Sequence, residues 1–105
     1  MTLPQREHPE AVAEFDTAVR WYEAQEPGIG LRLIDRAENA RQDITDWPNA
    51  APPFTTADDG TVIRSKAVRG YPYRIVYTVE PDSILILAYA HEGRKPGYWL
   101  HRRGD

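Results

Sequence analysis

The chain has 105 residues, enough for one domain with one hydrophobic core and too few for two. Hydrophobic residues make up 41% of it and charged residues 28%, proportions typical of a folded protein and not of a disordered one. No stretch approaches the roughly 20 apolar residues that span a bilayer, and the first residues lack the apolar core of a signal peptide. The absence of cysteine excludes disulfides and thiolate metal sites, and three histidines alone do not suggest a metal. We therefore expect one cytoplasmic domain over residues 1–105, without a cofactor or a membrane partner.

The net charge of -3 conceals a change of sign along the chain. Residues 1–60 hold five Arg and twelve acids (5 - 12 = -7), whereas residues 61–105 hold eight Lys or Arg and four acids (8 - 4 = +4). A cationic surface on an acidic protein can attract a phosphate polymer locally, but the surrounding negative field weakens long-range steering toward nucleic acid. An ordinary solvated charge distribution explains the composition equally well.

Two amphipathic helices are predicted over residues 8–47. Pro9 suits the first position of a helix, and Glu10 suits its positive end. Pro27 and Gly28 interrupt the pattern and so divide it into two antiparallel helices that share one apolar face. The apolar positions recur at helical spacing, at Ala11, Phe15, Ala18 and Tyr22 and then at Ile29, Leu33, Ala37, Ala40 and Ile44.

The second half of the chain has the pattern of strands. Residues 48–60 are rich in turn formers and are interpreted as a surface loop. A three-stranded antiparallel meander is expected over 61–91, followed by a tail over 92–105. The apolar run 84–90 suits a strand that is covered on both faces, in part by that tail. The predicted strands are 61–68, 72–80 and 83–90.

The register of the last two strands follows from the turn between them. If Pro81 and Asp82 form a two-residue turn, Glu80 opposes Ser83, and counting back places Arg74 opposite Tyr89. The face that carries Ile75 and Ile86 is strongly apolar and should receive the helices. The opposite face would then carry a polar cluster composed of Arg74, Tyr89 and His91.

The orientation of the first strand depends on the length of the loop around Arg69 and Gly70. An odd loop turns Ile63 and Ala67 toward the helices and places Arg64 and Lys66 beside Arg74. An even loop would bury the two cations at a cost of several kcal/mol, so we expect the odd loop. The cations could equally serve only to keep an exposed sheet face soluble.

The strand Tyr71-Pro72-Tyr73-Arg74-Ile75-Val76-Tyr77 is followed, after a short hairpin, by an aliphatic strand and then by a distinctive tail. The tail reads His-x-x-Arg-x-Pro-x-Tyr-Trp-x-x-Arg over residues 91–102. With Trp21-Tyr22-Glu23 and Pro27-Gly28-Ile29-Gly30 upstream, this order of motifs resembles the RelE/ParE superfamily of toxins from type II toxin–antitoxin systems. The resemblance covers roughly residues 10–102.

That resemblance implies an α+β fold in which an N-terminal helical hairpin packs on one face of a small twisted antiparallel β-sheet. It also implies a cognate antitoxin that binds and blocks the toxin in a hetero-oligomer. The superfamily includes two activities, namely metal-independent mRNA cleavage at the ribosome and poisoning of DNA gyrase.

RNA cleavage requires a base for the ribose 2′-hydroxyl, cations for the phosphorane and an acid for the departing oxygen. By resemblance, Arg74 would contact the phosphate, helped by Arg64 or Arg94, and Tyr98 would stack on a base or transfer a proton. His91 has a reference pKa near neutrality and is the natural acid or base. Further target-binding candidates are Arg64, Lys66, Trp99 and Arg102.

Each of these residues also has a purely structural interpretation. Tyr98 and Trp99 could pin the tail on the sheet, His91 could be satisfied by a backbone carbonyl, and Arg102 could cap a short tail helix. Glu92 and Gly93 stand where the nuclease branch carries more basic residues, and the acidic net charge also argues against RNA. Messenger RNA cleavage is the preferred interpretation. The alternatives are a gyrase poison and a decayed toxin that only binds its antitoxin.

Overall fold

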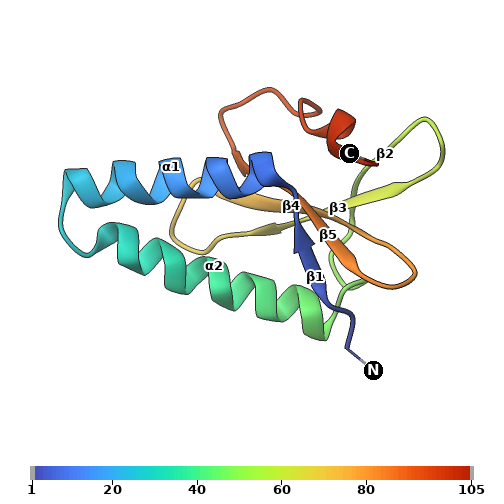
Figure 1. Cartoon of the computed structure of the whole chain (residues 1–105), viewed down its shortest axis with the longest axis horizontal. Coiled ribbons are helices and arrows are strands. Elements are labelled where there is room, and N and C mark those ends of the chain that lie inside the picture. Colours follow the sequence, from blue (N-terminus) through green and yellow to red (C-terminus); the bar gives the residue numbers. More distant parts are fainter. Residues whose placement is uncertain (1, 105) are drawn as a thin grey trace.

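The structure is a computed structural model that describes residues 2–104. Two helices form a hairpin beside a five-stranded sheet (Figure 1). The helices are α1 (Pro9–Gln25) and α2 (Ile29–Asp46), and a 3-10 turn, η1 (Leu100–Arg102), lies in the tail. The strands are β1 (Gln5–Glu7), β2 (Pro53–Thr56), β3 (Val62–Ala67), β4 (Tyr73–Val79) and β5 (Ile84–His91). None of the described helices is long and apolar enough to cross a membrane.

The helical hairpin begins and turns where the sequence predicts. His8 caps α1, because its Nδ1 accepts a hydrogen bond from the Glu10 amide at 3.1 Å, and Pro9 occupies the first turn. The chain reverses at Gly28, whose φ of 95° is the left-handed conformation that glycine adopts without strain. Since Gly28 has no side chain to cap α2, the Glu23 carboxylate accepts the amides of Gly28 and Gly30, both at 2.9 Å.

The two helices meet closely at Gly30. A Cβ atom at this position would lie 2.5 Å from the backbone oxygen of Val19 and 2.8 Å from Cβ of Glu23. Both contacts are shorter than packed atoms allow, so only glycine fits this helix contact.

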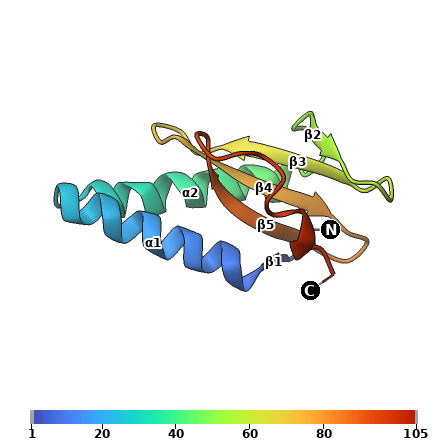
Figure 2. The same ribbon diagram turned by 90° about the horizontal axis from the view of Figure 1, so that it is seen from above.

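The sheet is covered on both faces. On one face α1 and α2 pack over a core that includes Leu33, Ile75 and Tyr77, and on the other the tail lies over a second core around Trp99 (Figure 2). All of Ile84 to Tyr89 is buried. The predicted α+β fold and the double coverage of this apolar strand are therefore confirmed.

The sheet has two strands that the sequence analysis did not predict. Its order is β1-β5-β4-β3-β2, with β1 parallel to β5 and the other pairs antiparallel, so the sheet is mixed and not wholly antiparallel. Strand β2 lies within the segment 48–60 that was expected to be a loop. Both added strands are short, and β2 is exposed throughout, so neither has the alternation that marks a half-buried strand.

A β-bulge corrects the predicted register of β5. The pairs Thr78–Leu85 and Tyr77–Ile86 agree with the prediction, but Val76 then pairs with Ala88, and Leu87 is the extra residue. Leu87 and Ala88 both belong to the core under the tail. Beyond the bulge the alternation is inverted, so Arg74 opposes Ala90 and Tyr89 lies on the helix side.

The orientation of β3 was also predicted wrongly. The Val68 amide donates to the Tyr73 carbonyl at 2.9 Å, so the connecting loop has four residues and is even. Arg64 and Lys66 therefore lie on the helix side, while Ile63 and Ala67 lie on the tail side with Arg74. The expected cost of burying the cations does not arise, because both lie at the partly open margin beside α2 and neither is buried.

Replacing Gly30 with alanine should weaken the hairpin. The added Cβ forces α1 and α2 apart, and we expect the free energy of unfolding to fall by about 2 kcal/mol. Urea unfolding followed by circular dichroism measures this loss. The exposed neighbour Leu31→Ala is the matched control and should change stability much less. Equal stability of Gly30→Ala and the unmodified protein would contradict the close contact.

Candidate functional site

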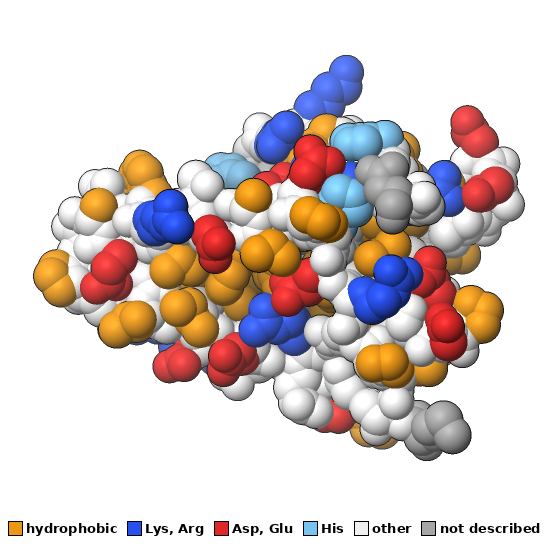
Figure 3. Space-filling view, viewed as in Figure 1, with side chains coloured by type: hydrophobic (Ala, Val, Ile, Leu, Met, Phe, Trp, Pro, Cys, Tyr) orange, Lys and Arg blue, Asp and Glu red, His pale blue; other side chains and the backbone are white. Residues whose placement is uncertain are grey.

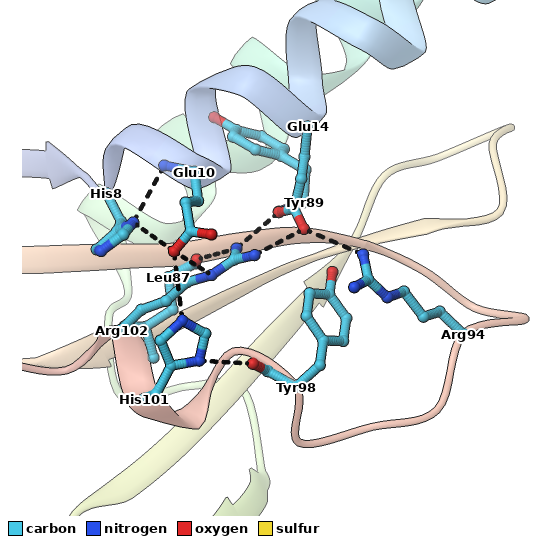
Figure 4. A network of polar contacts seen from close by, with 9 residues as sticks. All are labelled: His8, Glu10, Glu14, Leu87, Tyr89, Arg94, Tyr98, His101 and Arg102. Atoms are coloured by element: carbon cyan, nitrogen blue, oxygen red, sulfur yellow. Dashed lines mark hydrogen bonds and ion pairs between the residues drawn. The ribbon is translucent and has the colours of Figure 1, made fainter.

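The tail is fixed to the rest of the molecule by Arg102 and Glu14 (Figure 4). Arg102 is 4% exposed, and its Nη1 and Nη2 donate to the two Glu14 carboxylate oxygens at 2.9 and 3.1 Å. The same Nη1 donates to the Leu87 carbonyl at 2.9 Å, and Glu14 accepts the Tyr89 amide at 3.2 Å. Strand β1 pairs with β5 only as far as Ile86, so this ion pair satisfies the backbone of β5 where its neighbouring strand ends.

Tyr98 lies between two guanidinium groups. Arg94 Cζ is 3.5 Å from the centroid of the Tyr98 ring, and Arg102 Cζ is 5.1 Å from it. Burial, followed by the nearby Glu14 carboxylate, raises the pKa of Tyr98 to about 12. The phenol is therefore protonated at neutral pH and could act as a proton donor, not as a base. Arg94 also lies near Glu14, with 3.7 Å between Nη1 and Oε2.

His91 is exposed at the end of β5. Its Nδ1 accepts a hydrogen bond from the Gly93 amide at 2.9 Å, and its ring meets that of Tyr73 edge-on at 5.1 Å. The sequence allowed for a backbone carbonyl as the partner of His91. In the structure the ring instead accepts a hydrogen bond from a backbone amide. Since His91 pairs with Tyr73, it lies on the helix side of the sheet.

Arg74 lies on the other face. Its Nε donates to Ser65 Oγ at 2.8 Å, and its Nη2 is 3.4 Å from the Ser65 carbonyl oxygen. The predicted polar cluster of Arg74, Tyr89 and His91 is therefore wrong, because the bulge turns the last two residues toward the helices.

Arg64 and Lys66, the other cations predicted to lie near Arg74, are found at the margin of the sheet beside α2. The Arg64 guanidinium donates to the Ala51 carbonyl, and Lys66 Nζ is 3.6 Å from Asp43 Oδ2. Neither residue lies beside Arg74 on its face of the sheet, which corrects the expected phosphate clamp of Arg74 with Arg64.

Trp99 and Arg102, predicted as target-binding candidates, are both buried. Trp99 is 1% exposed and fills the core between the tail and the sheet. A ring in that position cannot stack on a base in this conformation. Trp99 pins the tail on the sheet, as its structural interpretation proposed. Arg102 also has a structural surrounding, but it pairs with Glu14 and does not cap a helix.

Sequence reasoning missed the acidic partners of this region. Glu14 falls within the first predicted helix but not among its apolar positions, and Glu7 precedes every predicted element. In the structure the Tyr89 hydroxyl donates to Glu7 Oε2 at 2.7 Å and accepts from Arg41 Nη1 at 2.7 Å. Burial and the Glu7 hydrogen bond raise the pKa of Tyr89. No local pattern reveals these pairs, since their members are 48 to 88 residues apart in the chain.

The predicted catalytic residues thus occupy separate places. Arg74 lies on the tail side of the sheet, His91 lies on the helix side, and Arg94 and Tyr98 lie in the tail against Glu14. The described residues contain no group of three or more acids or histidines arranged to hold a metal ion. The arrangement offers individual charged and protonated groups but no convergent set around one reacting atom.

Comparison with known proteins gives a fold relationship. No family model matches the sequence, and no curated protein matches it. The structure is similar to a chain from a solved structure described as the chromosomal ParDE toxin–antitoxin system from P. aeruginosa, with a TM-score of 0.71 and 15% sequence identity. The alignment covers 85% of this chain and 95% of that chain. The protein therefore has a ParE/RelE-like fold, as its sequence motifs predict.

Removing Arg102 should destabilise the whole domain. Arg102→Ala removes the two-point partner of the partly buried Glu14 carboxylate and the side-chain donor to the Leu87 carbonyl, and we expect a loss of about 3 kcal/mol in the free energy of unfolding. Chemical denaturation measures it. Arg103→Ala is the control, because its ion pair with Asp59 is more exposed and should contribute far less. Similar losses for both variants would show that the buried pair has no special role.

Alkaline pH should destabilise the protein through its tyrosines. The folded pKa of Tyr98 is about 12, above the ordinary value of 10.0, so the unfolded chain loses this proton first. The stabilising contribution is therefore complete below pH 10 and is lost as the pH rises toward 12. Urea midpoints across this range should fall, and should fall less for Tyr98→Phe. An identical decline in the variant would contradict the assignment.

Proposed function

We propose that this protein is the toxin of a toxin–antitoxin pair, and that it arrests growth until a cognate antitoxin binds it. Two observations support the proposal: the fold shared with a chain of a ParDE system and the order of motifs over residues 71–102. A protein partner also suits the surface of the hairpin. Large hydrophobic side chains are exposed on it, and hydrophobic side chains gather over α1 and α2 (Figure 3). They include Val12, Trp21 and Leu31.

We further propose that the toxin acts without cutting RNA, as a poison of DNA gyrase. The separation of Arg74 from His91 by the sheet carries this part of the proposal. In-line cleavage needs a base, an acid and a phosphate-binding cation within reach of one phosphodiester. Here the only candidate with a reference pKa near neutrality lies on one face, and the candidate phosphate-binding arginine lies on the other.

The charges of the tail favour the same choice over mRNA cleavage at the ribosome. Arg94 and Arg102 face Glu14, and His101 Nε2 is 3.3 Å from Glu10 Oε2, so acids neutralise much of the positive charge of the tail. A protein that binds a phosphate polymer gains affinity from cations that have no such partners. A gyrase target implies a cytoplasmic protein.

The proposal is tested by inducing the gene in a bacterium with and without the small gene beside it. We expect growth arrest without the neighbouring gene and relief with it. Transcript ends should be unchanged, while gyrase-linked DNA breaks should accumulate. New in-frame transcript cleavages would support the ribosome-dependent nuclease instead. No growth arrest would overturn toxicity for this protein and would leave an antitoxin-binding module.

Two variants separate the mechanisms further. Arg74→Ala and His91→Ala should each retain growth arrest, because a gyrase poison does not use these residues for bond cleavage. The same growth assay measures this result, with cellular protein levels compared by immunoblot. Loss of arrest in both variants at unchanged protein levels would contradict the non-nucleolytic mechanism.

A further inference from the structure

A groove of about 1140 Å³ lies between α2 and the outer margin of the sheet. One wall is formed by α2, including Arg36 and Asp43, and the other by Ser65 to Ala67 of β3. The carboxyl-terminal half of α2 approaches β3, where Asp43 lies 3.6 Å from Lys66. The segment after α2 closes one end of the groove, and it is held there because Tyr77 donates to the Pro48 carbonyl at 3.0 Å. The groove is thus formed in advance of any partner.

Along this groove β3 has an open edge. Strand β2 pairs only with Val62 to Arg64, so residues 65–67 have no neighbouring strand on that side. Since the Val68 amide bonds to Tyr73, alternation directs the backbone groups of Lys66 toward β4 and those of Ser65 and Ala67 outward. Ala67 is exposed, whereas Ser65 is buried and its carbonyl oxygen lies 3.4 Å from Arg74 Nη2. The open template for another polypeptide strand is therefore formed mainly by the amide and carbonyl of Ala67.

The groove is also cationic, although the chain as a whole is acidic. Its lining contains Arg36, Lys66, Arg69 and Arg74 but a single acid, Asp43, which pairs with Lys66. Within the described part of the chain, the side chains of Arg36 and Arg69 form no hydrogen bond or ion pair. These two arginines also line a second hollow of about 440 Å³ beside Trp21, Tyr22 and Tyr71. The positive surface therefore continues from the β3 edge toward the helix turn.

From these features we propose that the groove binds an extended acidic segment of a partner polypeptide, which pairs with β3 at residues 65–67 as an added strand. The open backbone row requires amide and carbonyl groups in register, which a peptide has and a nucleic acid lacks. The unpaired arginines supply the charge complementarity for Asp or Glu side chains. This inference goes beyond the proposed function and does not depend on toxicity.

The proposal is tested with a fluorescein-labelled peptide, Glu-Val-Glu-Val-Glu-Val-Glu, measured by fluorescence anisotropy against the full chain. The peptide should bind, and a peptide with Lys in place of every Glu should not. No binding of the acidic peptide would overturn the proposal. Equal binding of the two peptides would do so as well, because it would show that charge plays no part.

Variants locate the binding. Arg36→Glu combined with Arg69→Glu should lower the affinity for the acidic peptide by at least about tenfold. The matched control, Arg20→Glu with Lys95→Glu, changes the charge equally at exposed positions outside the groove and should keep most of the affinity. Equal weakening by both pairs would indicate a general charge effect and would overturn the site.

The backbone contact is tested at Ala67. Ala67→Pro removes an amide that points away from β4 and should abolish binding, while Ala67→Ser keeps the amide and should preserve it. Thermal unfolding of both variants checks that the sheet is intact. If Ala67→Pro is unfolded, the arginine pairs still decide the location. Retained binding by a folded Ala67→Pro would overturn strand addition.

A single-stranded RNA of repeated uridine, labelled in the same way, separates a peptide surface from a nucleic-acid surface. We expect it to bind much more weakly than the acidic peptide. The assignment to a polypeptide would be overturned if the RNA binds at least as tightly as the peptide and if this binding is lost in the Arg36→Glu, Arg69→Glu variant.

Discussion

The ion pair between Arg102 and Glu14 joins the parts of this molecule that are most distant in the chain. It links η1 to α1 across 88 residues and, through Leu87 and Tyr89, completes the hydrogen bonding of β5 beyond the end of β1. A buried charged pair needs partners for its remaining donors and acceptors, and here two backbone groups of the strand provide some of them. Arg102 Nε is buried without a hydrogen bond and lies 3.6 Å from Glu10 Oε2. The position of the tail, the burial of Trp99 and the surroundings of Tyr98 all depend on the pair with Glu14.

The bulge at Leu87 decides which chemistry the surface can offer. It places two consecutive side chains, Leu87 and Ala88, in the core under the tail, and it turns Tyr89 toward Glu7 and Arg41. One extra residue in a strand inverts every later side chain. Without it, Arg74 and His91 would share a face. With it, the two side chains are divided by the sheet and do not meet on one surface.

The sequence was sufficient for the helices, the three longer strands and the apolar character of β5, because each depends on periodicity and on turn residues such as Pro27 and Gly28. It was insufficient for β1 and β2, which are too short to show a period and exist because longer strands offer them an edge. The candidate site was predicted least well. Its geometry depends on a bulge, on an even loop and on the distant partner Glu14, and a register count along one hairpin detects none of these.

Strand β5 is completed from both ends of the chain. One edge of β5 pairs with β4 in a local hairpin. The other edge is completed by β1, which precedes both helices, and by Arg102 in the tail. Contacts of such high sequence separation have a larger loop-closure cost than those within a hairpin, so we expect them to form after the hairpin has closed. During that interval a fully apolar strand has one open edge, the state in which a chain is most prone to pair with another copy of itself. The order of folding is therefore as much a constraint on this sequence as the stability of the final structure.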